Sequence, residues 1–299
     1  MKLSYPLAVL AAAANAASNT LQRKADKEEP PELAMRPQLI LDLLHRPVWL
    51  AGLVTVIASF LLDGAALSMG RLAVVQPVLV LELPMTLIVA SRVFGSRLKG
   101  RDWVAIAAMT VGVAGLIYCL APQAARHRHI PVLLWGVGIG ITVAAVAVCV
   151  TASSRGGPAR RPALLGLASG ISFGLTAAFM KSATSALQHG PAAVFETWST
   201  YAMALAGLSA MFLMQNALQA GPLFAAQPGI TLADPGVAIL WGVLVFDEHT
   251  RTGLWLVGVV LSAVTLGAGT VLLSRSRLLQ SEMAPAADGG KTRSEEVRR

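Results

Sequence analysis

ALSMGRLAVVQPVLVLELP, residues 66–84, decides the fold, because the chain repeats it 151 positions later as ALQAGPLFAAQPGITLADP, residues 217–235. Eight of the nineteen aligned positions are identical, and they include the pairs Gly70/Gly221, Gln76/Gln227, Pro77/Pro228 and Pro84/Pro235. Each copy also carries one acid just before its second proline, Glu82 in the first and Asp234 in the second. Glycine, glutamine and proline in register indicate duplication of one structural unit.

The composition is that of a membrane protein. Only 13% of the residues are charged and 55% are hydrophobic, whereas a soluble domain has about 25% charged residues. Several apolar runs reach the roughly 20 residues that a helix needs to cross a bilayer. The net charge of +8 comes from Lys and Arg that lie between these runs. We therefore expect an all-α polytopic bundle with the lipid bilayer, and no nucleic acid, as its partner.

Apolar length and punctuation predict about nine spans, at residues 3–22, 47–65, 71–94, 102–121, 131–152, 162–187, 192–216, 222–246 and 252–274. The predicted domains are a first repeat at 1–121 with a polar linker at 23–46, a linking helix with its loops at 122–161, a second repeat at 162–274, and a disordered cytoplasmic tail at 275–299. The first span makes a poor signal peptide, since Lys2 is its only early charge. The sequence leaves open whether it is cleaved.

The duplication extends beyond its central stretch. Trp103 matches Trp255 and Phe94 matches Phe246, both at a spacing of 152 positions. Spans one to four thus correspond to spans six to nine, and span five is left as the linking helix. An odd number of crossings between equivalent spans turns the second four-helix unit upside down, which makes an inverted repeat.

Basic residues are unevenly divided between the two sides of these spans. The loops after odd-numbered spans and the C-terminal tail hold eighteen Lys and Arg residues, and the opposite side holds six. The positive-inside rule then puts the C-terminus in the cytoplasm and the N-terminus outside a cytoplasmic (plasma or inner) membrane.

Acids in the predicted spans are the main candidates for a binding site. Glu82 and Asp234 fall near the middle of spans three and eight, where a carboxylate facing lipid would cost a few kcal/mol or more. Function is one interpretation, and a neutral acid hydrogen-bonded between helices is the other. Pro77, Pro84, Pro228 and Pro235 surround these acids and predict discontinuous helices, because each proline leaves a backbone carbonyl without its donor. Gln76 and Gln227 are placed to bond to the freed groups.

Polar residues on spans one, two and six form further candidates. Asn15, Ser18, Asn19 and Gln22 share one helical face, and Thr55, Ser59 and Asp63 follow at four-residue steps. For Asn15, Asn19 and Asp63, cavity lining and interhelical hydrogen bonding both stay open. For the hydroxyls, including those of Ser169, Ser172 and Thr176, we expect interhelical hydrogen bonds.

Other features receive simpler interpretations. Gly166, Gly170 and Gly174 form a ridge of small residues suited to close helix packing. Lys181 is expected to extend its charge to a membrane interface, and residues 247–249 and 127–129 are expected to be solvated loops. Cys119 and Cys149 are interpreted as packing residues. No nucleophile–base pair or phosphate loop is present, so no enzyme and no cofactor are expected, and a metal site stays unknown.

Four segments resemble the drug/metabolite transporter superfamily: LQRKA at 21–25, ALSMGRLAVVQP at 66–77, ALQAGPLFAAQP at 217–228 and VLVFDEHTRTGLWLVGVVL at 243–261. The last is similar to the ending of EamA-type members, in which a glutamate closes one helix before the final span. Glu248 matches that glutamate, whereas the first half has Ser96 there. Nine spans and a basic end to the first span resemble the NIPA-type magnesium transporter branch instead.

The resemblance implies a secondary carrier of the cytoplasmic membrane, often an exporter, with a central cavity between its halves. The leading expectation is alternating-access transport of a small metabolite or drug, coupled or not to a proton or cation. Divalent cation transport through Asp63, Glu82 and Asp234 is the alternative. A non-transporting scaffold or sensor is the second alternative, and a homodimer is left open.

Overall fold

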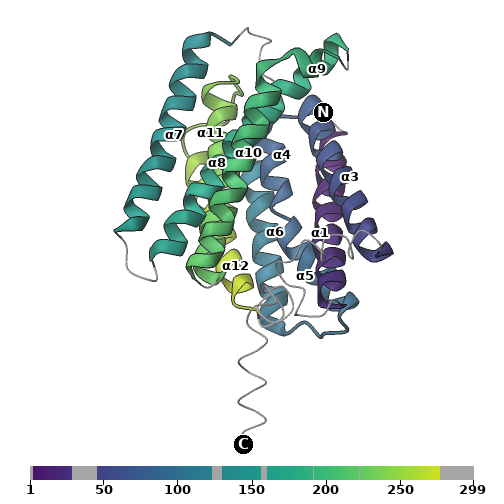
Figure 1. Cartoon of the computed structure of the whole chain (residues 1–299). Helices are drawn as coiled ribbons and strands as arrows, with labels where there is room; N and C mark the ends of the chain where they lie inside the picture. Colours follow the sequence, from purple (N-terminus) through teal and green to yellow (C-terminus); the bar gives the residue numbers. More distant parts are fainter. Residues whose placement is uncertain are drawn as a thin grey trace, which may run out of the picture.

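The computed structural model describes residues 3–28, 46–122, 130–155, 160–190, 192–221 and 223–276, and the elements in these ranges are helices (Figure 1). In chain order they are α1 (Ser4–Glu28), α3 (Pro47–Met69), α4 (Leu72–Leu79), α5 (Glu82–Val93), α6 (Gly100–Leu120), α7 (Val132–Ser154), α8 (Arg160–Ser185), the 3₁₀ turn η2 (Ala186–His189), α9 (Ala193–Glu196), α10 (Trp198–Ala220), α11 (Leu223–Leu244) and α12 (Trp255–Ser274). The expectation of an all-α protein is confirmed for the part of the chain described.

Seven helical segments within these ranges are long and apolar enough to cross a membrane. They are α3, α4 with α5, α6, α7, α8, α10 and α12. The two remaining long helices, α1 and α11, carry several of the polar site candidates, such as Asn19 and Asp234. Large apolar side chains such as Leu205 and Val132 are 70% and 82% exposed on the outside of the bundle, as expected for a surface that contacts lipid.

Two predicted boundaries were wrong. The polar linker does not begin at residue 23, since α1 continues to Glu28. Lys, Arg and Glu are good helix formers, so a change from apolar to charged residues does not end a helix. The seventh predicted span combined α9 with α10, because the apolar run continues through Thr197, whose extended backbone separates them. Apart from residues 275 and 276, the predicted disordered tail at 275–299 lies outside the described residues, as does most of the linker.

Helix packing joins segments far apart in the sequence. The most extensive contacts are those of α8 with α10 and α11, of α1 with α3, and of α6 with α12. The helix α7 packs on α8 and forms one edge of the bundle, while α3 forms another (Figure 1). The α1 helix also contacts α4 and α5. In each half three or more helices thus pack together, and the α6–α12 pair joins the two halves.

The α6–α12 pair is antiparallel. A Cβ atom added at Gly112 would lie 2.8 Å from the Leu266 amide nitrogen, and one added at Gly269 would lie 2.7 Å from Met109 Cγ. At one end of the pair the Trp255 ring meets the edge of Tyr118, with 5.7 Å between centroids. Trp103, which begins α6, therefore lies at the opposite end of this pair from Trp255.

The predicted glycine ridge of α8 is confirmed as a close packing surface. A Cβ atom at Gly166, Gly170 or Gly174 would lie 2.4 Å, 2.7 Å and 2.8 Å from the carbonyl oxygens of Ala226, Ile230 and Asp234, respectively. The partner residue is always 60 positions later, so α8 and α11 run in parallel. Only glycine allows the two backbones to approach this closely.

Candidate functional site

The centre of the first repeated stretch is a break between two helices. Pro84 has no amide hydrogen, so the Val80 carbonyl cannot accept the regular bond from four residues later. It accepts instead from the Leu83 amide at 3.3 Å, and Leu81 donates to Val78 at 3.0 Å. The helix restarts at Glu82, where the positive end of the α5 dipole favours a carboxylate.

Glu82 is held by the asparagine face of α1. Asn19 donates from Nδ2 to Glu82 Oε1 at 2.8 Å, and the Asn15 side chain is a second hydrogen-bond partner of the same carboxylate. Residues four apart lie on one side of a helix, which explains why both asparagines reach one acid. The structure thus brings together the candidates Asn15, Asn19 and Glu82.

One partner of this hydrogen bond lies on the packed face of α1 and is nevertheless exposed. Asn19 is exposed, although it follows Ala8 by eleven residues and Ala12 by seven and therefore shares their face of α1. Ala8 and Ala12 are 0% and 1% exposed, while Leu10, on the lipid-facing side, is 55% exposed. The face of α1 that is buried at Ala8 and Ala12 is thus exposed at Asn19, in the part of α1 nearer to Glu28.

Two more acids lie near Glu82. Asp63 on α3 and Asp234 on α11 each have a buried Oδ1 atom with no hydrogen-bond partner. Asp234 is near enough to both Asp63 and Glu82 for electrostatic repulsion. Acids from α3, α5 and α11 therefore gather around one region. No group of three His, Cys, Asp or Glu side chains in the described ranges is arranged to hold a metal ion.

The proline prediction holds for only one copy. Pro77 lies in α4 and Pro84 in the first turn of α5, on either side of the break. Pro228 and Pro235, by contrast, lie inside the continuous helix α11, so their prediction as helix-breaking residues was wrong. The α8 ridge packs directly on the α11 backbone, and a Cβ atom at Gly229 would lie 2.7 Å from the Leu167 amide nitrogen. We attribute the continuity of α11 to this support.

Gln227 does not make the hydrogen bond that the sequence predicted. Gln227 donates from Nε2 to the Thr231 hydroxyl at 3.2 Å and not to a carbonyl freed by proline. Gln76 is 4% exposed and buried in α4. Gln227 therefore bonds within its own helix, and for Gln76 a bond to a freed carbonyl stays a prediction.

Interhelical hydrogen bonding is confirmed for three of the hydroxyls, the first being that of Ser18, which donates to the Gly52 carbonyl at 2.8 Å. Ser59 donates to the Ala11 carbonyl at 2.9 Å, and Ser169 donates to the Ala210 carbonyl at 3.0 Å. The hydroxyls of Thr55, Ser172 and Thr176 instead donate to carbonyls of their own helices. Side-chain geometry within one turn decides between these outcomes.

Sequence reasoning missed two residues at the other end of the bundle. Glu248 is not solvated but 3% exposed, and its carboxylate accepts hydrogen bonds from the amides of Leu72 at 2.7 Å and Ala73 at 3.0 Å. Lys181 does not extend into an interface, since its Nζ donates to the carbonyls of Leu67, at 2.7 Å, and Gly70. The available signal was Arg71, which cannot cap the α4 amides as Ser or Asp would.

Comparison with known proteins gives one informative relative. No protein-family profile matches the chain, and no solved structure matches it. An uncharacterized protein of Corynebacterium glutamicum is 31% identical over 281 residues, which cover 90% of this chain and 95% of the relative. At this identity and coverage the whole helical chain is shared, and the protein belongs to the same family as this uncharacterized Corynebacterium protein.

Proposed function

We propose that the chain is a secondary transporter of the drug/metabolite transporter type, which exports a small metabolite or drug across the cytoplasmic membrane by alternating access. The Asn19–Glu82 hydrogen bond carries this proposal. It joins an acid at a helix break to an exposed amide on the inner face of α1. Interrupted helices with polar groups at their ends are typical of solute sites in carriers.

Equivalent contacts in the two halves support an inverted repeat. In the first half, Ser59 bonds to the carbonyl of Ala11. Span one ends in LQRKA at 21–25 and span six in FMKSA at 179–183, a spacing of 158 positions. Adding 158 to position 11 and 151 to position 59 gives Ser169 and Ala210, and these two residues are bonded in the second half. The donor Ser59 is on α3, the second helix of its pair, and the donor Ser169 is on α8, the first helix of its pair. The two hydrogen bonds nevertheless join equivalent positions of the two helix pairs.

A second equivalence concerns the small residues that face the interrupted or kinked helix. Subtracting 158 from positions 166, 170 and 174 of the α8 glycine ridge gives Ala8, Ala12 and Ala16. These alanines are at most 1% exposed. Small residues at the same register allow α1 to approach α4 and α5 as α8 approaches α11.

The proposed topology has nine crossings, with α7 as the linking helix between inverted units. The opposite positions of Trp103 and Trp255 along the α6–α12 pair agree with inversion. The excess of basic residues on one side then assigns a cytoplasmic C-terminus and an outside N-terminus. No enzymatic activity is proposed.

The three acids Asp63, Glu82 and Asp234 support coupling of transport to a proton or a cation. Buried carboxylates that repel one another need a compensating positive charge, and the electrostatic neighbours of Asp234 are Asp63 and Glu82. Protons or a cationic solute would supply that charge. We therefore include proton or cation coupling in the proposal.

Flux from proteoliposomes tests the function. Vesicles preloaded with a panel of amino acids, amines and organic acids are diluted with and without a proton gradient, and released solutes are identified by mass spectrometry. We expect gradient-dependent release that Glu82→Gln lowers by at least about tenfold, since an isosteric amide keeps the fold but not the charge. Normal release by Glu82→Gln would remove the proposed site, and no release of any solute would favour the scaffold or sensor.

Magnesium transport is the second candidate, favoured by the gathering of three carboxylates. Mg²⁺ is bound through one or two carboxylates and retained waters, so a site without three direct protein ligands is still compatible with it. Mg²⁺ should then raise the unfolding temperature of the protein, and Glu82→Ala and Asp63→Ala should abolish this effect. An unfolding temperature that does not depend on Mg²⁺ would contradict magnesium transport and favour transport of an organic solute.

A further inference from the structure

The α3–α4 junction at Gly70 and Arg71 lies beside the start of α1, whereas the exposed Asn19 lies in the part of α1 nearer to Glu28. There α3 ends and α4 begins with no side-chain cap of its own. Ser4, at the start of α1, also packs against this junction, since a Cβ atom at Gly70 would lie 2.7 Å from Ser4 Cβ. This end of the first half is therefore tightly packed.

Two side chains from the second half hold both sides of the junction. Glu248, which follows α11, accepts the Leu72 and Ala73 amides at the start of α4. Lys181, near the end of α8, donates to the Leu67 and Gly70 carbonyls at the end of α3. We call these four hydrogen bonds the junction clamp.

The two charges of the junction clamp lie where they stabilise the ends of α3 and α4. An anion lies at the amino end of one helix and a cation at the carboxyl end of the other, so each compensates a helix dipole. Glu248 and Lys181 also attract each other electrostatically. Separating the halves here would leave the Leu72 and Ala73 amides, two carbonyls and two charges without partners, which is costly until water enters.

We propose that the junction clamp is the gate that closes the Gly70 end of the site, and that it must break when this end opens. The proposal rests on the alternating-access function above. Its position fits the exposure of the residues on either side, because Asn19 is exposed while Ser4, Leu72 and Ala73 at the Gly70 junction are at most 2% exposed.

The opposite end has a weaker version of the same device. The first half has Ser96 at the position of Glu248. A serine offers no charge, so the carboxylate of the clamp has no counterpart there. The chain therefore favours the state in which the Gly70 end is closed and the other end is open.

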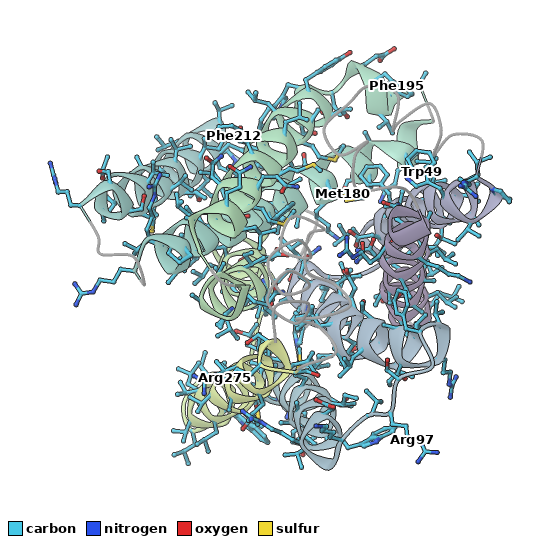
Figure 2. The ribbon with its side chains drawn as sticks, turned by 60° about the horizontal axis from the view of Figure 1, so that its bottom comes forward. Trp49, Arg97, Met180, Phe195, Phe212 and Arg275 are labelled. Atoms are coloured by element: carbon cyan, nitrogen blue, oxygen red, sulfur yellow. The ribbon has the colours of Figure 1, made fainter. Side chains whose placement is uncertain are left out.

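Pulsed electron spin resonance distances test the gate. Spin labels are attached at Tyr5→Cys and Phe195→Cys in a Cys119→Ser/Cys149→Ser chain reconstituted into nanodiscs. Both positions are exposed, at 40% and 68%, and they belong to different halves. Figure 2 labels Phe195, which lies away from the end with Arg97 and Arg275. The unmodified clamp should give one dominant distance.

Three variants weaken the clamp in different ways. Glu248→Gln and Lys181→Met remove one charge each. Gly242→Ala keeps both charges but displaces the carboxylate, because the added methyl would lie 2.6 Å from Glu248 Oε2. Gly236→Ala, on the same helix as Gly242, is the matched control, since its methyl would meet nothing within 4 Å.

We expect each clamp variant to raise the population of a longer distance by roughly tenfold, and the Gly236→Ala control to match the parent. Unchanged distances in all three folded variants overturn the gate, even if solute flux is normal. Longer distances in a protein that transports nothing support the clamp as a conformational lock and contradict the proposed transport. The two proposals thus fail in different measurements.

Discussion

At three successive turns of α8 the space that a side chain would occupy is filled by the backbone of α11. The shortest approach is at Gly166, where an added Cβ atom would lie 2.4 Å from the Ala226 carbonyl oxygen. Backbone atoms cannot move aside as the end of a flexible side chain can. A side chain larger than hydrogen at these three positions would therefore push α8 and α11 apart.

Gly166→Ala is expected to destabilise the protein by about 1–3 kcal/mol, the usual cost of overpacking. Gly140→Ala on α7 is the control, since its methyl would meet nothing within 4 Å and alanine is the better helix former. The unfolding temperature in detergent is the measurement. A Gly166→Ala protein as stable as Gly140→Ala would contradict the close packing of α8 on α11.

Glu248 is the second residue on which stability depends. Its removal by Glu248→Ala leaves the Leu72 and Ala73 amides buried without an acceptor, and we expect a loss of about 2–4 kcal/mol. Glu196→Ala is the control, because Glu196 is exposed and surface changes cost little. Chemical unfolding of both variants gives the comparison, and equal stability would mean that water replaces the carboxylate at no cost.

At the scale of the element, two copies of one pattern give different helices. Both copies have prolines seven residues apart, yet the first divides into α4 and α5 and the second forms α11 without a break. Proline removes a donor in both copies, so the local sequence predicts a weak point but not whether the helix separates there. The neighbouring helix decides, glycine-lined in one half and alanine-lined in the other.

Pro84→Ala restores an amide that can donate to the Val80 carbonyl, so we expect the break to close into continuous helix. Hydrogen exchange of the backbone at residues 78–88 should slow by at least about tenfold. Pro235→Ala, in a helix that is already continuous, should change exchange far less. Equal responses of the two copies would indicate that the break depends on tertiary contacts alone.

At the scale of the whole molecule, the two halves should begin equivalent helices on opposite sides of the membrane. Arg97, before α6, and Thr252, before α12, are both exposed. In a chain without Cys119 and Cys149, an impermeant maleimide should label Thr252→Cys in intact cells. Arg97→Cys and Arg275→Cys, which lie at the same end in Figure 2, should react only after permeabilisation. Labelling of Arg97→Cys in intact cells would exclude the inverted arrangement.

The candidate site shows how far residue patterns extend into function. Asn15 and Asn19 stood out because they share a helical face, and Glu82 because it is an acid in an apolar run. That Asn19 bonds to Glu82 required the packing of α1 against α5, 63 positions apart. Glu248 lies in a polar turn that looks solvated, and only the approach of the α4 amides makes it a buried group.

The sequence by itself determined the helices, the approximate ends of most spans and the glycine ridge of α8, because helix period, apolar length and residue size are local properties. Only the tertiary structure decided which helices separate at their prolines, which acids lie together and where Lys181 and Glu248 bind. Those outcomes depend on backbone groups of helices that are distant in the chain. Every residue has such groups, so the identity of a residue does not predict where its backbone will be bound.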